Sequence, residues 1–572
     1  MKQFKSILLL KLPYYTHPEA LSKDDDFRTK LPFRPAPSLA LATLCGFIDK
    51  YKTFDYDLKA IDINIEAYTE SKVPIDPAVY MDLLTDCIKN NEYDVLALSV
   101  AFVFNVRWVD VAVKLSRKFH PEAKIVIGGG YPTLFPALCP KNHDIDDVVI
   151  GEGESTFLHI LNKYNNHHDP EFEKKFPFEA YASRNEKNEV IVSDQKKSFI
   201  DMNNLPIPAW HYLNVEKYFK RSGDKTLPIE GSRGCPYRCS YCCTYLSWGR
   251  VVRYKPVEHL INEIKEMKKR YSVEALHFLD DNLSFSKKWI KEFLTQIIAL
   301  KLPLKFVSSN FSIKHLDEEI IDLLDKAGIT QFGIAVESGS PEIQKRINKN
   351  LNFDKVREVV KIMKSRNLHV HLLWMVGFPN ETMNQIKSTF DFARELKATS
   401  NQFQPVLPYP GTQLYKEAKN ANLLRFQEDT LDKFEIRKCN YLKSDEWDYD
   451  KLREMIYDVN IELNFLNNFL LDTKQGMDYM LRYIENFLLR LPEHIIARMI
   501  VGYLYKQKNN MAKCEEYYNS VINLFEDSIL YNTFIKYLSW EHYIIDDFKQ
   551  YLKTTRGQNS EKAVNCAFLL SA

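Results

Sequence analysis

Three cysteines, Cys235, Cys239 and Cys242, lie in one short stretch that reads Gly-Cys-Pro-Tyr-Arg-Cys-Ser-Tyr-Cys. The spacing C-x-x-x-C-x-x-C supplies three soft thiolates from a single loop. Three thiolates suit three irons of a four-iron, four-sulfur cluster and leave the fourth iron without a protein ligand. Gly231 and Gly234 let the backbone come close to a cluster and to whatever binds it. The stretch therefore predicts an iron-sulfur site with one iron open to chemistry.

A structural zinc site is the main alternative for these cysteines. It needs a fourth ligand at similar spacing, and no histidine lies between His211 and His259. Cys243 directly follows Cys242, and neighbouring side chains diverge too much to close a tetrahedron around one ion. A disulfide is disfavoured because nothing at the N-terminus looks secretory. Spacing alone favours iron and sulfur, with zinc as the second choice.

The cysteine stretch resembles the signature of the radical S-adenosylmethionine (SAM) superfamily, including the aromatic Tyr241 before the third cysteine. The resemblance implies that Cys235, Cys239 and Cys242 carry a [4Fe-4S] cluster and that Tyr241 lies beside the adenine of SAM. It also implies that SAM chelates the open iron. An electron from the cluster would then cleave the sulfonium and give a 5′-deoxyadenosyl radical.

Strand-like and helix-like segments alternate downstream, as expected of a parallel α/β sheet, and six such units predict a partial (β/α)6 barrel. Ligands of parallel sheets bind at the carboxyl ends of the strands, where this chain places its unusual residues. The expected strands are residues 227–230, 275–279, 304–308, 331–336, 369–376 and 402–407.

Several strand-end residues match features of the SAM site in the same family. By resemblance, Glu337 binds the ribose hydroxyls and the turn at Gly377 lies near the adenine. Asp280 and Asp281 stand where the family contacts the methionine amino group, although the Gly-Gly-Glu form of that motif is missing. Ser308 ends another strand and completes the predicted SAM-binding set.

Asp280 and Asp281 also have a purely structural interpretation. Carboxylates ahead of an apolar-periodic segment are typical helix N-caps, and residues 285–300 have that pattern. Both interpretations stay open at this point.

The first 170 residues predict a doubly wound α/β domain. Two glycine-bearing loops directly follow strands, Gly128-Gly-Gly-Tyr-Pro-Thr and Gly151-Glu-Gly-Glu-Ser-Thr, and such loops let a large ligand contact the main chain. The phosphate-binding fingerprint G-x-G-x-x-G is absent, so a nicotinamide domain is disfavoured. The expected elements are strands 5–12, 56–63, 94–100, 124–127 and 147–150 and helices 38–49 and 107–119.

This N-terminal region resembles the cobalamin-binding domain that precedes the barrel in many radical SAM enzymes. The D-x-H-x-x-G motif, which supplies a cobalt ligand in cobalamin mutases, is missing. We therefore name no protein ligand to cobalt. The residues that the resemblance assigns to cobalamin are Ser99, Gly128, Gly129, Gly130, Tyr131, Thr133, Gly151, Glu152 and Gly153.

Composition bounds the remaining possibilities. The chain has 572 residues, 45% hydrophobic residues and a net charge of +1, which allow two to four domains with real cores. The balanced charge gives no footprint for nucleic acid. No apolar run predicts a membrane span, so a cytoplasmic protein is expected. From about residue 448 the periodicity becomes helical, with long segments at 451–471, 477–489, 495–506 and 514–525.

The expected organisation is a cobalamin-binding domain (1–170), a linker (171–222), a radical SAM barrel (223–440) and a C-terminal helical domain (441–572). The resemblance implies a radical SAM enzyme with a [4Fe-4S] cluster, SAM and cobalamin, which methylates an unactivated carbon of a small molecule or peptide. An external flavodoxin- or ferredoxin-type protein would donate the electron. A rearrangement, ring contraction or cyclisation is the alternative reaction, and a non-catalytic cobalamin or redox sensor is the alternative class. The substrate stays unassigned.

Overall fold

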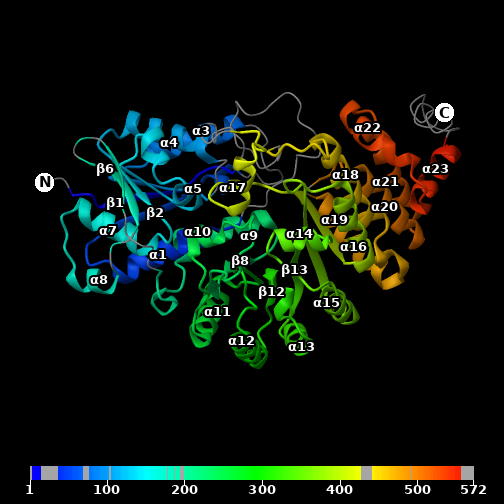
Figure 1. The fold of residues 1–572 in the computed structure, drawn as a ribbon, viewed down its shortest axis with the longest axis horizontal. Helices are drawn as coiled ribbons and strands as arrows, with labels where there is room; N and C mark the ends of the chain where they lie inside the picture. The colour runs from blue at the N-terminus through cyan, green and yellow to red at the C-terminus, as the bar shows by residue number, and fades with distance from the viewer. Residues whose placement is uncertain are drawn as a thin grey trace.

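The computed structural model describes residues 3–14, 36–67, 77–101, 105–176, 178, 180–185, 187, 189–193, 199–426, 441–489 and 491–555. Figure 1 shows an N-terminal sheet with helices on one side of the molecule, a second sheet in the middle and a group of helices at the far side. The sequence therefore folds into the α/β architecture with a helical C-terminal region that its periodicity predicts.

The N-terminal sheet A has seven strands in the order β2-β1-β3-β4-β5-β6-β7. Its first five strands are parallel and the last two are antiparallel. The strands are β1 (Ser6–Lys11), β2 (Asp57–Asp62), β3 (Val95–Ser99), β4 (Lys124–Gly128), β5 (Asp147–Val149), β6 (Tyr181–Arg184) and β7 (Val190–Val192).

Alternate residues of β1 point to two different cores. Ile7 and Leu9 pack in the core that also holds α1 (Leu39–Tyr51) and α7 (Glu154–Tyr164). Leu8 and Leu10 pack in the core of α3 (Pro77–Asn90) and α4 (Val106–Phe119). Successive side chains of a strand face opposite ways, so a strand covered on both faces is apolar throughout. The doubly wound interpretation of this region is confirmed.

The segment expected to be a linker contributes structure of its own. The β6–β7 hairpin extends sheet A, since β6 pairs antiparallel with β5. Further along, the Ala209 N–H donates to the Ala42 carbonyl of α1, and Trp210 beside it is fully buried. A side chain at Gly46 would collide with this segment, because its Cβ would lie 3.0 Å from the Ile207 carbonyl oxygen.

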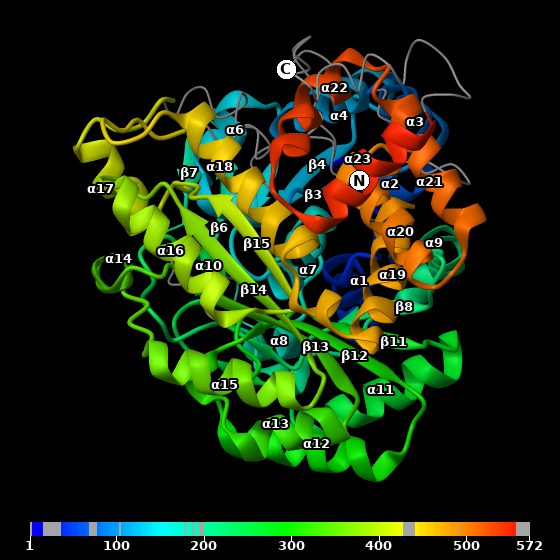
Figure 2. The ribbon, with the colours of Figure 1, turned by 90° about the vertical axis from the view of Figure 1, so that its right-hand side faces the viewer.

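The central sheet B has six parallel strands in the order β15-β14-β13-β12-β11-β8. All six coincide with predicted strands to within three residues at either end. A row of helices covers the outer face of the sheet (Figures 1 and 2). The strands are β8 (Thr226–Ile229), β11 (Ala275–Phe278), β12 (Lys305–Phe311), β13 (Ile329–Glu337), β14 (His369–Val376) and β15 (Ser400–Pro405); the helices are α11 (Val257–Tyr271), α12 (Lys287–Leu300), α13 (Glu318–Lys326), α15 (Phe353–Ser365) and α16 (Met383–Leu396).

Sheet B is open, and asparagine side chains cover the backbone of its edge strand β15. Asn464 accepts from the Asn401 N–H at 2.6 Å and donates to the Asn401 carbonyl at 2.8 Å. Asn468 donates to the Thr399 carbonyl at 3.0 Å. An uncovered edge exposes unpaired N–H and C=O groups to other chains, and these amides satisfy them without a further strand.

The covering asparagines come from a segment that the periodicity predicts as one helix over 451–471. The structure breaks it into α18 (Tyr449–Ile461), a π-helical turn (Glu462–Leu466) and a short 3-10 turn (Phe469–Asp472). The π turn inserts extra backbone inside a helix, which side-chain periodicity does not reveal. The single-helix prediction is therefore wrong in the part that contacts the sheet edge.

The remaining helices form a separate core beside this edge. α20 and α21 are a packed pair, in which the ring of Tyr518 fills the space over Gly502: a Cβ there would lie 2.4 Å from it. Within the described residues, no helix has both the length and the apolar character needed to cross a membrane. The helices are α19 (Lys474–Leu488), α20 (Ile495–Gln507), α21 (Met511–Leu524), α22 (Ser528–Phe534) and α23 (Tyr543–Thr555).

Candidate functional site

The three-cysteine loop is held at its base by a small two-stranded ladder. The strands β9 (Ser232–Arg233) and β10 (Arg253–Tyr254) pair antiparallel, and the loop with its short helix α10 (Thr244–Trp248) runs between them. Gly234 has a φ of +94°, and a Cβ there would lie 2.4 Å from the Val251 carbonyl oxygen. Glycine is thus required where the two ends of the loop cross, as its backbone freedom predicts.

The three cysteines are half-buried and close enough to influence one another. Burial raises the pKa of the Cys235 and Cys242 thiols, and neighbouring thiols of the same loop raise it further. The Asn282 amide points at Cys235, with Nδ2 4.0 Å from Sγ. Among the described residues, no three His, Cys, Asp or Glu side chains converge on a position for a single metal ion. A donor set of three thiols from one loop, with an amide donor at one sulfur, fits an iron-sulfur cluster.

Tyr241 and Glu337 meet beside the cysteine loop. The Tyr241 hydroxyl donates to Glu337 Oε1 at 2.8 Å, and the Lys349 ammonium lies 3.4 Å from the same oxygen. Glu337 is buried and ends β13 with a φ of +73°, next to an irregularity in the β13–β14 register. A left-handed backbone at a non-glycine residue is strained, so the surrounding contacts hold Glu337 in place.

Asp280, which follows β11, is buried against the backbone of the segment that leads to the cysteines. It accepts from the N–H groups of Gly231 at 3.1 Å and of Ser232, and from the Ser232 hydroxyl at 2.6 Å. Burial raises the pKa of Asp280 to about 7, although these hydrogen bonds oppose the shift. Asp281 accepts from Thr244 Oγ1 at 3.1 Å.

The helix-capping interpretation of the two aspartates is wrong. The N-cap of α12 is Ser286, whose hydroxyl accepts from the Trp289 N–H. The apolar periodicity made the helix start two residues too early, and the aspartates lie in the turn before it. Their carboxylates contact the base and the first helix of the cysteine loop instead.

The turn at Gly377 is built around a buried glutamate that the sequence reasoning missed. Glu381 Oε2 accepts from the N–H groups of Gly377 at 2.6 Å and Phe378 at 2.9 Å. Burial raises the pKa of Glu381 to about 7. Trp447, from the start of the C-terminal region, donates to the Glu381 carbonyl at 3.1 Å. Ser308 ends up inside β12, between Phe278 of β11 and Phe332 of β13, and its side chain lies outside the described residues.

A cavity of about 400 Å³ opens at the carboxyl ends of sheet A. Of the nine residues assigned to cobalamin, eight line it: Ser99, Gly128, Gly129, Gly130, Thr133, Gly151, Glu152 and Gly153. Tyr131 does not, because its ring is buried in the core against Phe135. No histidine is among the described residues that line the cavity.

The glycine loop after β4 packs closely on the residues that follow β3, and one residue of the cavity wall has a buried hydroxyl without a partner among the described residues. A Cβ at Gly130 would lie 2.3 Å from the Ala101 carbonyl oxygen, and one at Gly129 would lie 2.5 Å from that of Val100. Thr43 is one of the residues that line the cavity, and its hydroxyl oxygen is buried and has no hydrogen-bond partner among the described residues. Buried polar groups without partners in a native protein require an explanation such as a ligand. These features fit a large cofactor with polar groups.

The opposite wall of the same cavity comes from the domain of sheet B, which carries the three-cysteine loop and is called the cysteine domain below. Glu230, Arg233, Ser247, Trp248 and Leu279 line it, and none of them was predicted as a site residue. The Arg233 guanidinium lies against the Trp248 ring, 5.0 Å from its centroid. The cavity therefore lies between the glycine loops of sheet A and the segment that leads to the cysteines.

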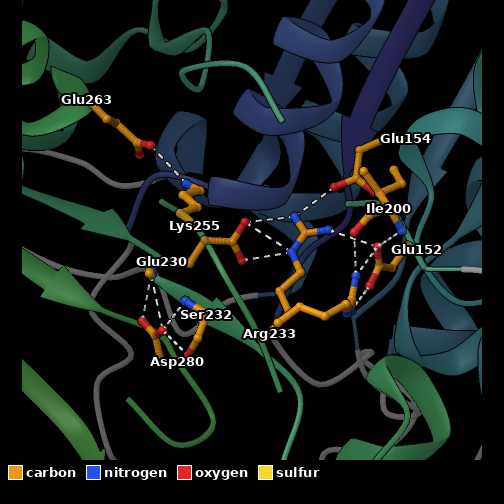
Figure 3. Close-up of polar contacts among 11 residues, drawn as sticks. Glu152, Glu154, Ile200, Glu230, Ser232, Arg233, Lys255, Glu263 and Asp280 are labelled. Carbon is orange, nitrogen blue, oxygen red and sulfur yellow. Dashed lines mark hydrogen bonds and ion pairs between the residues drawn. The ribbon is translucent and has the colours of Figure 1, made fainter. Parts of the chain in front are cut away.

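A buried charge cluster joins the two sheets across this wall (Figure 3). Arg233 donates to Glu230 at 2.7 Å and to Glu154 at 2.8 Å. Arg233 Nη1 lies 3.4 Å from Glu152 Oε2, and Glu152 also pairs with Arg253. Glu152 and Glu154 follow β5, whereas Glu230 follows β8. The cluster therefore fixes the glycine loop of sheet A relative to the base of the cysteine loop.

Charge balance within the cluster sets the ionisation of its members. Burial by itself raises the pKa of the Glu230 carboxyl, but Arg233 and Lys255 more than offset it, so the pKa lies below its ordinary value. Burial likewise raises the pKa of Glu152, and there the arginines compensate less than fully. Arg233 is the chief partner that keeps these carboxylates stable in the interior.

Comparison with known proteins identifies both halves of this arrangement. The radical SAM superfamily matches residues 229–393, and the B12 binding domain matches residues 51–161. The first match contains the three cysteines, Asp280, Glu337 and Gly377. The second contains Ser99 and both glycine loops.

Two relatives and one solved structure are similar to most of the chain. The cytidylyl-2-hydroxyethylphosphonate methyltransferase of Streptomyces wedmorensis is 26% identical over 475 residues, 77% of this chain and 88% of that protein. An anaerobic magnesium-protoporphyrin IX monomethyl ester cyclase of Cereibacter sphaeroides is 21% identical over 411 residues, 71% of this chain and 63% of the cyclase. The cobalamin-dependent SAM radical enzyme OxsB with aqua-cobalamin bound has the same fold, with a TM-score of 0.62, 15% identity and coverage of 99% of this chain and 83% of OxsB.

The chain therefore combines a radical SAM domain and a B12-binding domain in one enzyme. Its cofactors are a [4Fe-4S] cluster, SAM and cobalamin. The cluster motif could be recognised in the sequence because its three ligands lie within eight residues of one another. Arg233 and Glu381 carried no comparable signal, because each acts through partners that the fold alone brings near.

Proposed function

We propose that this protein is a cobalamin-dependent C-methyltransferase that acts on a small molecule or peptide between its two domains. One observation carries the proposal: a single cavity is bounded by the cobalamin-type glycine loops and by Arg233, Trp248 and Leu279 of the cysteine domain. Cobalamin held by the glycine loops and a cluster with SAM held by the three cysteines would then approach a substrate at the opening of this cavity, between the domains.

When bound, the cluster with SAM supplies hydrogen-atom abstraction, and cobalamin supplies the methyl group. The protein contributes binding and orientation. The cluster would be held by Cys235, Cys239 and Cys242. Glu337 would accept hydrogen bonds from the ribose hydroxyls of SAM, and the Gly377 turn would contact the adenine.

The two aspartates divide their tasks under this proposal. Asp280 accepts from the N–H groups of Gly231 and Ser232 and from the Ser232 hydroxyl, so it positions the start of the cysteine loop. Asp281 accepts from Thr244, which stands two residues after the last cysteine, and is the better placed to take the methionine amino group. Both carboxylates are largely shielded from water, which strengthens such contacts.

The inner part of the cavity suits the nucleotide tail of cobalamin. Leu9, Leu39, Ala97, Val126 and Phe157 line it, between α1 and strands β1, β3 and β4. Flat heteroaromatic bases bind well in apolar slots that carry few polar groups. The volume of about 400 Å³ accommodates part of a cofactor of this size, so the corrin ring would lie at the opening between the domains.

We also propose that the enzyme works in the cytoplasm, where thiols stay reduced, with an external flavodoxin- or ferredoxin-type electron donor. Anaerobic reconstitution with iron, sulfide and cobalamin followed by incubation with methyl-labelled SAM tests the main proposal. Candidate substrates are a nucleotidylated phosphonate, a peptide and a tetrapyrrole. Label in the product, found by mass spectrometry, supports methyl transfer; a product without label contradicts it.

A non-methylating rearrangement or cyclisation is the second candidate, favoured by the similarity to the cyclase. The nucleoside products separate the two. Methyl transfer releases S-adenosylhomocysteine together with 5′-deoxyadenosine, whereas the second candidate releases no homocysteine product. A sensor without catalysis would cleave SAM at no appreciable rate under reducing conditions.

A further inference from the structure

The cysteine loop has a second side, which does not line the cavity of sheet A. The residues between its first two cysteines, 236–238, are not among those that line the cavity, and Arg238 is exposed next to Cys239. The cavity is lined instead by Ser247 and Trp248 of α10, at the other end of the loop. The stretch 236–238 therefore lies at the surface close to the cysteines, on a side that no ligand proposed so far uses.

Three rings pack together on this side of the loop. The Tyr237 hydroxyl and His315 Nε2 form a hydrogen bond of 2.5 Å. Phe285, which is 37% exposed, lies edge-on to both rings, with its centroid 6.3 Å from that of Tyr237 and 5.3 Å from that of His315. Arg250 donates to the Tyr237 carbonyl at 2.8 Å and so holds the backbone between the first two cysteines. A partly exposed aromatic surface of fixed shape thus lies directly beside these cysteines.

Exposed cations from two neighbouring segments surround these rings. The Lys314 ammonium lies 5.0 Å from the centroid of the Tyr237 ring. Lys345 belongs to the short helix α14 (Pro341–Arg346), which ends at Ile347. The Ser240 N–H of the cysteine loop donates to the Ile347 carbonyl at 3.0 Å, so the end of α14 lies against the loop. Segments far apart in the sequence thus bring positive charge to one place.

These rings and cations form a surface that we call the cysteine-loop patch: Tyr237, Arg238, Phe285, Lys314, His315 and Lys345. Its arginine and two lysines are exposed and have no ion-pair partner among the described residues. Of the acidic residues on the same segments, Asp317 is paired with Lys287, and Glu342 of α14 offsets one positive charge. The whole chain has a net charge of only +1, so the positive surplus is a local property of this patch.

The proposed reaction requires an electron to reach the cluster from outside the protein. Electron transfer becomes much slower with distance, so the donor must approach where the cluster ligands come near the surface. Complexes between electron-transfer proteins have small, transient interfaces, and opposite charges speed their formation. A partly exposed aromatic centre with basic residues around it suits an acidic partner.

We propose that the cysteine-loop patch is the docking surface for an acidic protein that carries a single low-potential electron. The carrier loses one electron and the cluster gains it, with no bond formed or broken. The inference rests on the proposed function, which needs this supply of electrons. It adds the place where a flavodoxin- or ferredoxin-type donor binds and the sign of the charge that the donor carries there.

The rate of cluster reduction tests the patch. Full-length wild type, R238E/K314E and the milder R238Q/K314Q are reconstituted anaerobically with cluster and cobalamin. K89E/K114E is the matched control, because it makes the same change of charge at exposed lysines of α3 and α4, which cover sheet A. Each protein is mixed rapidly with reduced flavodoxin, reduced ferredoxin or dithionite. The electron paramagnetic resonance signal of the reduced cluster is then followed in freeze-quenched samples at low salt and at about 1 M salt.

Charge reversal in R238E/K314E should slow reduction by a protein carrier about 10- to 100-fold at low salt, because attraction between opposite charges raises association rates by this order. R238Q/K314Q should lose less, about threefold, and K89E/K114E should stay within about twofold of the wild type. Dithionite needs no docking surface, so its rates should agree in all four proteins. At about 1 M salt the screening length falls to about 3 Å, and the difference between R238E/K314E and the wild type should shrink.

Three results overturn the inference. Reduction of R238E/K314E by both carriers at the wild-type rate at low salt shows that they dock elsewhere. An equal loss of rate with dithionite means that the substitutions damage the cluster itself. An equal loss in K89E/K114E means that total charge, and not the patch, sets the rate. Iron and sulfide content identifies a variant that has lost its cluster, and R238Q/K314Q then makes the same comparison.

The wild type separates failure of this inference from failure of the proposed function. A wild-type cluster that dithionite reduces but neither carrier reduces contradicts the acidic carrier as partner. A reduced wild type that does not cleave SAM contradicts the proposed function, whatever the carriers do.

Discussion

The parallel strands of the two sheets end in different kinds of residue. In sheet A, glycines lie at or just after the ends of β4 and β5, at Gly128–Gly130 and at Gly151 and Gly153, and a cavity of about 400 Å³ lies beside them. In sheet B, carboxylates lie at or just after the ends of β11 and β13, at Asp280 and Glu337, and both are buried and hydrogen-bonded. At these strand ends, sheet A offers main-chain groups to a ligand, whereas sheet B offers carboxylate side chains.

We relate this difference to the size and charge of the ligand that we propose for each site. A large cofactor contacts main chain over a wide area, which requires absent side chains and close backbone approaches. A small zwitterion is oriented by a few charges in a site shielded from water, where electrostatic interactions are strong. The Arg233 cluster connects the two sheets, because its carboxylates follow strands of both.

Removing the cluster ligands should separate the two sites completely. In C235A/C239A/C242A we expect no iron-sulfur absorbance after anaerobic reconstitution, because the loop then has no thiolate ligands. Cobalamin should still bind, since the residues that we propose for it lie at the end of sheet A. Iron and sulfide analysis and cobalamin absorbance after desalting measure the two. Equal loss of cobalamin would show that the two sites are not independent.

Cutting the link between the sheets should cost stability. R233M leaves Glu152, Glu154 and Glu230 without their shared partner in the interior. Removing one partner of a buried pair typically costs about 3–5 kcal/mol of the free energy of unfolding. Denaturant unfolding of the apoprotein measures it.

The matched control for this variant is R270M. Arg270 pairs with Glu266 at 2.8 Å, but its side chain is 63% exposed. Exposed pairs contribute about 1 kcal/mol or less. A loss in R233M no larger than that in R270M would mean that the cluster does not stabilise the joint.

Much of both sheets could be predicted from the sequence because the information is local. The strand His369–Val376 alternates buried and half-buried residues along its whole length, and its predicted bounds are those of the structure. The glycine loops and the cysteines are contiguous motifs. Their placement at strand ends follows from the rule that parallel strands gather their carboxyl ends at one edge.

The joints between elements could not be predicted, because they depend on pairs far apart in the chain. Arg233 and Glu154 are 79 residues apart, and Trp447 and Glu381 are 66 apart. Asn464 meets the edge strand through a π turn that leaves no trace in hydrophobic periodicity. Tyr131 shows the converse error: it belongs to a motif that contacts the cavity, yet the strand-to-helix turn directs its ring into the core.

Filling the cavity of sheet A tests whether absent side chains are what it requires. A Cβ at Gly153 would contact only Val149, at 3.6 Å, so G153A should be tolerated. G153L projects further into the space and should weaken cobalamin binding by about 3 kcal/mol, or roughly 100-fold, through overpacking. Equilibrium dialysis measures it, and the iron content should stay at the wild-type level. Unimpaired binding in G153L would place the cofactor elsewhere.

The buried carboxyl groups near the strand ends of sheet B should make the free energy of unfolding depend on pH. The pKa of Glu381 is raised to about 7 by burial, whereas a glutamate in an unfolded chain titrates near about 4.3. The folded state therefore holds a proton that the unfolded state releases, and the free energy of unfolding falls as pH rises through this interval. Between about pH 5.5 and 8 the Glu381 contribution amounts to about 2 kcal/mol.

E381Q removes this titration while keeping an oxygen that accepts from Gly377 and Phe378. We expect the stability of E381Q to fall less than that of the wild type over the same range. Asp280, whose pKa is also raised to about 7, titrates in both proteins and cancels in the difference. Parallel stability curves for E381Q and the wild type would mean that Glu381 is already ionised in the fold. The turn at Gly377 would then resemble the charged cluster at Arg233 rather than a neutral carboxyl held by its backbone.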